Sequence, residues 1–207
     1  MARPQSPATK LNLLQAAFAV IRRQGYAGTT VDQICAEAGV SKGAFFHHFS
    51  SKEDLAVAAA QHWSEVTGDF FKQAAYHDAY DPLERVLAYV LFRKQLIQGP
   101  IAEFTCLVGT LSQEIYGTSE QIRKACWESI SGHADTLVAD IRTAMELYRV
   151  QEGFTAESLA LHTQAVIQGA FILAKASDDP ERAIESIDHL CRYLKLLFRS
   201  GKQDQII

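Results

Sequence analysis

Apolar residues recur along this chain at intervals of three and four, which is the spacing of one face of an α-helix. The first such stripe consists of Leu11, Leu14, Phe18 and Ile21. No stretch alternates apolar and polar residues as a half-buried strand would, and proline and glycine fall at the ends of the periodic segments. The pattern predicts an all-α protein of about nine helices, at roughly residues 7–25, 30–39, 41–49, 51–75, 81–99, 101–116, 119–149, 155–176 and 180–201.

The segment 29–55 carries the most specific set of helix boundaries. Thr30, followed three residues later by Gln33, predicts a capping box that opens a short helix, and Gly39 is its left-handed stop. Ser41 then caps a second short helix. The inward anchors of that helix are Phe45 and Phe49. Two short helices joined by a tight glycine turn form a helix-turn-helix, which places its second helix in the major groove of DNA.

Composition and charge are consistent with this interpretation. The chain is 48% hydrophobic and 21% charged, as in ordinary globular proteins, and no apolar run approaches the ~20 residues that span a bilayer. The first ten residues lack the apolar segment of a signal peptide, so we expect a cytoplasmic protein with no membrane partner. Residues 1–60 contain six basic and four acidic residues, whereas the rest contains 14 and 20. A mildly basic head on an acidic body suits a nucleic-acid contact at one end.

The chain carries no motif of a metal module or an enzyme. Its four cysteines are widely spaced and form no CxxC pair, so the sequence predicts neither a zinc module nor a disulfide framework. HExxH, G-x-S-x-G and phosphate-loop motifs are absent, so we expect no catalysis, no catalytic residue and no cofactor. Two alternatives stay open: a metal sensor whose ligands converge from separate helices, and a helical interaction protein that has lost DNA binding.

Residues 10–55 resemble the TetR family (TetR/AcrR type) of bacterial transcriptional regulators. The matching positions are Gly25-Tyr26, Thr29-Thr30, Ile34, Ala38-Gly39-Val40-Ser41, Gly43, Phe45, His48-Phe49 and Lys52-Glu53-Asp54-Leu55. The resemblance implies a three-helix DNA-binding domain at residues 1–51 and a larger helical ligand-binding and dimerisation domain at residues 52–207. It also implies a homodimer that binds an inverted-repeat operator in double-stranded DNA and is released by a small-molecule effector. Repression is expected, with activation as the alternative.

The predicted DNA contacts lie around the second helix of this motif. Lys42 sits in its first turn, where a cation reaches phosphate or a guanine edge. Gly43 either lets the DNA backbone approach or relieves packing against the preceding helix. The family commonly has tyrosine at position 46, and Phe46 lacks its hydroxyl. From helix-terminus chemistry we expect phosphate contacts at Thr29 and Thr30, and the resemblance adds Ser41, Lys42, Gly43, Phe46, His47, His48 and Lys52.

The body of the protein is expected to hold the dimer interface and the effector pocket. The apolar stripes of the last two helices and the resemblance predict an interface at Thr163, Val166, Ala170, Leu173, Ile187, Leu190 and Leu194. The alternative is that both stripes pack within their own subunit. Candidate pocket residues are Trp63, Phe70, Tyr89, Phe92, Phe104, Leu107, Leu111, Tyr116, Trp127 and Phe171, with Glu103, His133 and His162 as polar groups. Ordinary core packing is the alternative for each of them.

Overall fold

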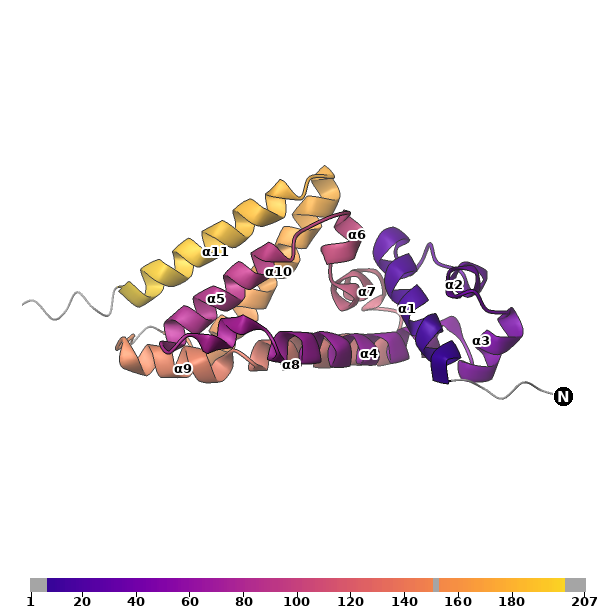
Figure 1. Ribbon diagram of the computed structural model, residues 1–207, viewed down its shortest axis with the longest axis horizontal. Helices are drawn as coiled ribbons and strands as arrows, with labels where there is room; N and C mark the ends of the chain where they lie inside the picture. The colour runs from indigo at the N-terminus through magenta and orange to yellow at the C-terminus, as the bar shows by residue number, and fades with distance from the viewer. Residues whose placement is uncertain (1–6, 151–152, 200–207) are drawn as a thin grey trace, which may run out of the picture. The chain divides into compact units, whose positions relative to one another are not determined.

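The computed structural model describes residues 7–150 and 153–199 of the chain. Within these residues the backbone forms eleven α-helices and one 3-10 turn, and it contains no strand (Figure 1). The all-α prediction is therefore confirmed. The elements are α1 (Pro7–Gln24), α2 (Val31–Ala38), α3 (Lys42–His48), α4 (Lys52–Lys72), η1 (Ala75–Asp78), α5 (Pro82–Gln95), α6 (Ile101–Phe104), α7 (Leu107–Ile115), α8 (Glu120–Asp135), α9 (Val138–Leu147), α10 (Ala156–Ser177) and α11 (Glu181–Arg199).

Two of the predicted helices are each divided in two. The segment predicted at 101–116 breaks between α6 and α7, where Cys106 has an extended backbone. The segment predicted at 119–149 breaks after α8, because Thr136 donates both its N–H and its hydroxyl to His133 O, at 3.3 and 2.7 Å. Neither break carries a glycine or proline, the residues that mark many of the other boundaries. The stop predicted for the last helix, Gly201, lies outside the described residues.

The chain divides into two compact units, each with its own interior. The N-terminal unit comprises residues 1–69 and 105–130, so α7 and most of α8 belong with α1–α3 and most of α4. This division does not coincide with the predicted boundary between residues 51 and 52, because Leu55, Ala56 and Ala59 of α4 are fully buried in the same core as α1–α3. The other large side chains of this core include Leu13, Ile21, Ile34, Phe45, Leu107, Leu111 and Ile122.

The C-terminal unit comprises residues 70–104 and 131–207, and its described helices pack around α5 and α10. α10 and α11 run side by side, and α5 packs against α9 and α11 (Figure 1). Two ion pairs tie α5 to its neighbours: Arg85 binds Asp140 of α9 at 2.6 Å, and Lys94 binds Asp188 of α11 at 2.8 Å. Both pairs are partly shielded from solvent, where a charge needs a partner.

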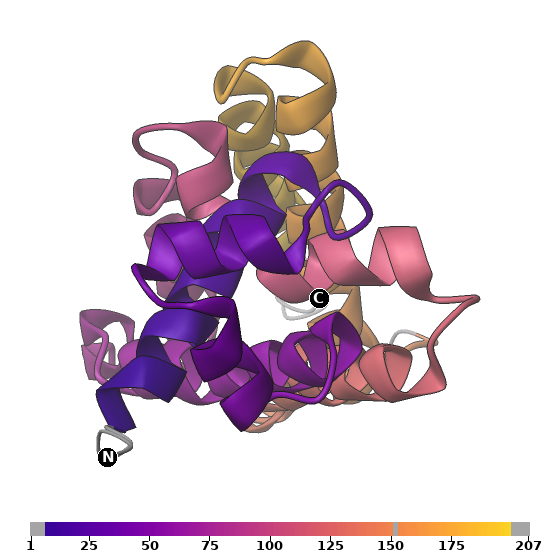
Figure 2. The same cartoon turned by 90° about the vertical axis from the view of Figure 1, so that its right-hand side faces the viewer.

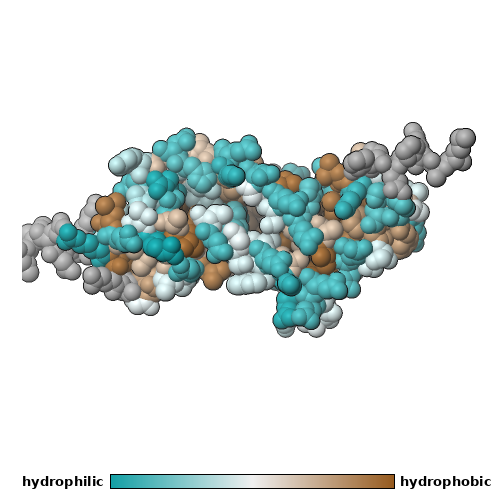
Figure 3. All heavy atoms as spheres, turned by 90° about the horizontal axis from the view of Figure 1, so that it is seen from below, coloured by the Kyte–Doolittle hydropathy of each residue, from teal (hydrophilic) through white to brown (hydrophobic). Residues whose placement is uncertain are grey.

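The surface mixes apolar and hydrophilic residues. On the face drawn in Figure 3, apolar patches are interspersed with hydrophilic residues. Among the described residues, no helix is long and apolar enough to cross a bilayer.

Candidate nucleic-acid interface

Capping residues that lie close together in the sequence determine where α2 and α3 begin and end (Figure 2, violet). Thr30 Oγ1 accepts the N–H of Gln33 at 3.2 Å, while Gln33 Oε1 accepts the N–H of Thr30 at 2.9 Å, which is the predicted capping box. Gly39 ends α2 in the left-handed conformation, with φ of 66°. Ser41 Oγ caps α3 by accepting the N–H of Ala44 at 3.2 Å. The helix-turn-helix geometry predicted from these residues is confirmed.

Phe45 and Phe49 fix which side of α3 faces the interior. Phe45 is 0% exposed and Phe49 is 3% exposed, so both are anchored in the core of the N-terminal unit as predicted. The opposite side of α3 is left at the surface. There Phe46 is 52% exposed, and its ring meets the edge of Phe45, with ring centroids 5.1 Å apart. His47 is also exposed, whereas His48 is partly buried beside it.

The first turn of α3 is open around Gly43. A Cβ added to this glycine would meet only Ser41 Oγ, at 3.8 Å, among the described residues. Packing against α2 therefore does not explain the glycine, and that alternative is excluded. Glycine costs a helix about 1 kcal/mol relative to alanine. Because no contact within the N-terminal unit explains this cost, we expect the explanation to be a contact with another molecule. Close approach of a DNA backbone supplies such a contact.

Lys42 projects from the same turn and is paired with an acidic residue of α2. Its ammonium lies 2.9 Å from Asp32 Oδ1, and the two side chains are 57% and 71% exposed. An exposed pair of this kind contributes only about 0.2–1 kcal/mol, so Lys42 can leave Asp32 for a phosphate at little cost. Asp32 was not predicted from the sequence, because its proximity to Lys42 depends on how the turn between the two helices folds.

Two of the residues predicted to contact phosphate have hydrogen-bond partners within the chain. Thr29 is 1% exposed, and it donates its hydroxyl to Gly25 O at 2.5 Å and its N–H to Tyr26 O at 3.1 Å. Lys52 donates to Tyr26 O at 2.9 Å and to Thr29 O at 2.8 Å, with its ammonium 4.1 Å from the centre of the Tyr26 ring. Burial lowers the pKa of Lys52, partly offset by the charge of Glu114. Both side chains hold the turn between α1 and α2, which favours a structural role over the predicted phosphate contact.

Glu114 of α7 holds the same turn from the other side. Its carboxylate accepts the N–H of Ala27 at 2.8 Å, and a Cβ added at Gly25 would collide with Glu114 Oε1. Gly25 also has a φ of 80°. The turn that precedes α2 is thus held by two charged groups from α4 and α7. No local signal reveals Glu114, because 87 positions separate it from Ala27.

The C-terminal unit contains a buried polar cluster centred on Tyr89. The Tyr89 hydroxyl lies 2.9 Å from His133 Nε2 and accepts a hydrogen bond from Gln164 Nε2 at 2.8 Å. Tyr89 is 0% exposed and Gln164 is 3% exposed. Burial, reinforced by the nearby charge of Arg93, lowers the pKa of His133 to about 3. The imidazole is therefore neutral at physiological pH.

The ten predicted pocket residues are divided equally between the two units. Leu107 and Leu111 are fully buried in the core of the N-terminal unit, where Trp63 packs at its margin, so for these residues the packing alternative holds. Tyr116 and Trp127 are exposed, at 69% and 57%. The other five belong to the C-terminal unit: Phe70, Tyr89, Phe92, Phe104 and Phe171. Of the polar candidates, His133 joins this second group through Tyr89, whereas Glu103 and His162 are exposed.

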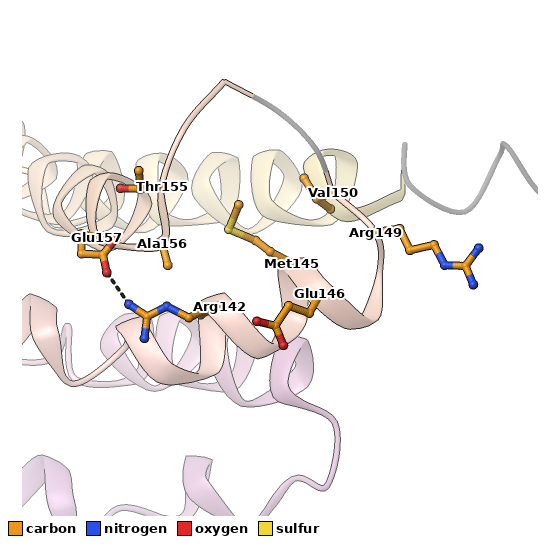
Figure 4. Close-up of a pocket in the computed structure, with 8 residues that line it drawn as sticks. All are labelled: Arg142, Met145, Glu146, Arg149, Val150, Thr155, Ala156 and Glu157. Atoms are coloured by element: carbon orange, nitrogen blue, oxygen red, sulfur yellow. Dashed lines mark hydrogen bonds and ion pairs between the residues drawn. The ribbon is translucent and has the colours of Figure 1, made fainter.

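A pocket of about 460 Å³ lies elsewhere in the C-terminal unit, between α9 and the start of α10. None of the predicted pocket residues lines it. Figure 4 shows that Arg142 and Glu157 form an ion pair across it, while the side chain of Arg149 is directed away from them. The residues that line the pocket are Arg142, Met145, Glu146, Arg149, Val150, Thr155, Ala156 and Glu157.

The predicted dimer residues mostly face the interior of their own chain. Exposure is at most 2% for five of the seven, so these residues have no surface to offer a second copy: Thr163, Ala170, Ile187, Leu190 and Leu194. For these five the alternative of packing within the subunit holds. Val166 is partly buried, and Leu173 is 53% exposed. The apolar residues on the outer side of α10 and α11 are instead Leu161, Ile172, Leu173, Tyr193 and Leu196.

The described part of the chain contains no cluster of metal-ligating side chains. There, no group of three or more histidine, cysteine, aspartate or glutamate side chains is arranged to hold a metal ion. The four cysteines are free thiols, and three of them are buried: Cys35, Cys126 and Cys191.

Known sequence families cover most of the chain. Residues 13–59 match the family described as bacterial regulatory proteins, tetR family, and residues 82–190 match the tetracyclin repressor-like C-terminal domain. The HTH-type transcriptional regulator LmrA of Bacillus subtilis (strain 168) is 31% identical over 172 residues, which cover 78% of this chain and 84% of that protein. The HTH-type transcriptional repressor NemR of Escherichia coli (strain K12) is 26% identical over 200 residues, covering 90% and 92%.

Solved structures share the fold. A TetR transcriptional regulator from Chloroflexus aurantiacus superposes with a TM-score of 0.76 at 25% identity, covering 90% of this chain and 94% of that one. The regulator CifR, as a cysteine mutant complexed with 26 bp of double-strand operator DNA, superposes with a TM-score of 0.74 at 20% identity, covering 93% and 98%.

Proposed function

Because the chain belongs to the TetR family of bacterial regulatory proteins, and is thus a DNA-binding transcriptional regulator rather than an enzyme, we propose that it represses transcription. In this proposal a homodimer occupies an inverted-repeat operator, and a small molecule bound in the C-terminal unit releases it. A repressor acts where the bacterial chromosome lies, in the cytoplasm. The name of one relative supports repression, since NemR is called a transcriptional repressor.

The outer face of α3 carries this proposal. Lys42, Gly43, Phe46 and His47 all lie at the surface, on a helix whose other side is anchored by Phe45. The arrangement offers a cation, an open backbone and an apolar ring to one groove of DNA. The operator complex of CifR, a protein of the same fold, supports double-stranded DNA as the partner.

The outer face of α10 and α11 supports the homodimer. Large apolar side chains are exposed there, including Leu173 at 53% and Leu196 at 61%. A two-fold dimer needs one self-complementary patch, and two adjacent helices with apolar outer sides supply it. Two-fold symmetry in the protein in turn requires an inverted repeat in the DNA, with half-sites about 34 Å or a multiple of it apart.

A binding selection tests the function whichever genes the protein controls. Purified protein would be incubated with a pool of random duplex DNA, and the bound fraction would be amplified and sequenced over several rounds. We expect an inverted repeat to be enriched, and a gel shift with that sequence to survive an excess of unrelated DNA. Enrichment of no sequence, or of a sequence without two-fold symmetry, would contradict the proposal.

Replacement of Lys42 by alanine tests the assignment of α3. We expect Lys42→Ala to weaken binding to the selected operator about tenfold or more and to lower the salt slope by about one, because one cation is lost from the DNA interface. Lys124→Ala, which removes an exposed lysine from α8, is the matched control. Both variants should elute as dimers from a sizing column. Equal affinity of Lys42→Ala and Lys124→Ala would remove α3 from the interface.

A further inference from the structure

Three cations of α5 differ in how their charges are satisfied. Arg85 donates to Asp140 and also to the carbonyl groups of Ala79 and Tyr80, all within 2.9 Å. Lys94 lies 2.8 Å from both oxygens of Asp188. Arg93 is partly buried like the other two, yet its guanidinium has neither an ion pair nor a hydrogen bond among the residues that the structure describes.

Aromatic rings, rather than acceptors, surround the Arg93 guanidinium. Its central carbon lies 5.1 Å from the centre of the Phe71 ring and 5.6 Å from that of Phe171. Ring faces attract the cation but accept none of the five N–H bonds in the guanidinium plane. A partly buried cation with unused donors is costly unless an anion completes it.

The groups beside Arg93 are apolar or neutral. Phe71 also contacts Phe92 and His133, with ring centroids 5.6 and 4.6 Å apart, and Phe104 lies 5.9 Å from Phe171. His133 is neutral at physiological pH, since its pKa is lowered to about 3. Two acidic side chains of the neighbouring helices, Asp140 and Asp188, are already paired with Arg85 and Lys94. The cluster therefore keeps the positive charge of Arg93 and presents apolar surface around it.

We propose that Arg93 binds the carboxylate of a small effector whose aromatic or aliphatic body packs on Phe70, Phe92, Phe104 and Phe171. The planar guanidinium matches a carboxylate in shape and can donate two parallel hydrogen bonds to it. The phenylalanine rings suit an apolar body rather than a sugar or a nucleotide. This inference rests on the proposed function in one respect, namely that the ligand in the C-terminal unit is the effector.

Calorimetric titration of the full-length protein tests the site directly. The probes are phenylacetate and 4-phenylbutyrate, with phenylacetamide as the neutral analogue of the same shape. We expect the carboxylates to bind roughly tenfold or more tightly than the amide, the difference that a charge-assisted pair of hydrogen bonds makes. Arg93→Gln should abolish that preference, and Arg93→Lys should retain part of it because the charge remains.

Arg142→Gln is the matched control, since it removes an arginine that lines the separate pocket between α9 and α10. It should keep the carboxylate preference in full. Circular dichroism would establish that each variant is folded. If Arg93→Gln does not fold, the carboxylate preference is measured with Arg93→Lys, where it should be reduced. The inference is overturned if carboxylates and amide bind alike, if Arg93→Gln keeps the preference, if Arg142→Gln loses it, or if neither carboxylate binds at about millimolar concentration.

A separate measurement distinguishes this inference from the proposed function. Operator affinity of wild type and of Arg93→Gln, both without probe, should be equal, because Arg93 lies in the C-terminal unit. If the wild-type protein binds no operator, the proposed repressor function is contradicted, but the calorimetric result at Arg93 is unaffected. Operator binding that no probe changes, together with calorimetric binding at Arg93, would show that the site exists but does not regulate.

Discussion

α3 and α5 differ in how their polar side chains are bound: those of α3 are exposed with few partners, whereas those of α5 are more buried and mostly hydrogen-bonded. On α3, Lys42 makes a single exposed ion pair, and Gly43 has almost no neighbours. On α5, Tyr89 is fully buried with two hydrogen-bonded partners, and Arg85 is held by several acceptors. Changes on the outer face of α3 should therefore alter binding with little effect on folding. Changes on α5 should alter folding, with Arg93 as the exception that indicates a ligand.

Acid should destabilise the C-terminal unit through His133, and this is the largest effect we expect. The pKa of His133 falls from its ordinary value of 6.5 to about 3 in the folded chain, because of burial first and the charge of Arg93 second. Between these two values the unfolded chain binds the extra proton, so stability falls as the pH falls. From about pH 6.5 to about pH 4.5 the free energy of unfolding should drop by about 2–3 kcal/mol.

Urea unfolding at a series of pH values measures this loss. His133→Gln should flatten the dependence over this range, whereas His189→Gln, at an exposed position of α11, should leave it as in wild type. The same slope in wild type and His133→Gln would show that the imidazole is not the group responsible.

Two arginines of α5, Arg85 and Arg93, should respond differently to substitution. Arg85→Gln leaves the carboxylate of Asp140, which is only 23% exposed, without its partner and should cost about 2 kcal/mol. Arg93→Gln removes no ion pair among the described residues and should change the free energy of unfolding by less than about 1 kcal/mol. Thermal and urea unfolding of both variants would check this. A larger loss for Arg93→Gln than for Arg85→Gln would mean that Arg93 serves the fold.

Lys52 tests where the DNA-binding face ends. Lys52→Met removes two charge-assisted hydrogen bonds to the turn between α1 and α2 and should cost about 1.5 kcal/mol of stability. The salt slope of operator binding should stay that of wild type, because the ammonium is engaged with the turn. Lys72→Met, at the exposed end of the same helix, is the control. A salt slope lowered by about one in Lys52→Met alone would make Lys52 a phosphate contact after all.

The sequence predicts the head better than the body, and the reason is physical. Each boundary of α2 and α3 depends on residues close by in the chain, such as Thr30 with Gln33, or Gly39 with its left-handed backbone. The roles of Thr29 and Lys52 depend instead on the path of the turn between α1 and α2. A threonine or lysine at a helix start looks the same in sequence whether it binds phosphate or its own chain.

In the body, α10 shows why the sequence does not predict which apolar residues are buried within the subunit. Leu159 and Ala160 are buried while Leu161 and Leu173 are exposed, so the helix is apolar on nearly every side. Its periodicity therefore does not tell which stripe faces inward. On α11 the stripe of Ile187, Leu190 and Leu194 packs within its own subunit, since all three are buried, and Tyr193 and Leu196 stay exposed. The fold of the subunit buries such an apolar stripe, so only the apolar surface that stays exposed is available to a second subunit.

Gly43→Ala, measured for both stability and DNA affinity, tests whether α3 lies against DNA. The new methyl group meets nothing closer than 3.8 Å in the described chain, so α3 should gain about 0.5–1 kcal/mol of stability. If α3 faces the DNA backbone, the same methyl group should weaken binding to the selected operator by roughly tenfold. Gly68→Ala on α4, which likewise has open space around its Cβ position, should stabilise without changing affinity. A Gly43→Ala protein that is more stable and binds the operator as tightly as wild type would contradict the placement of α3 against DNA.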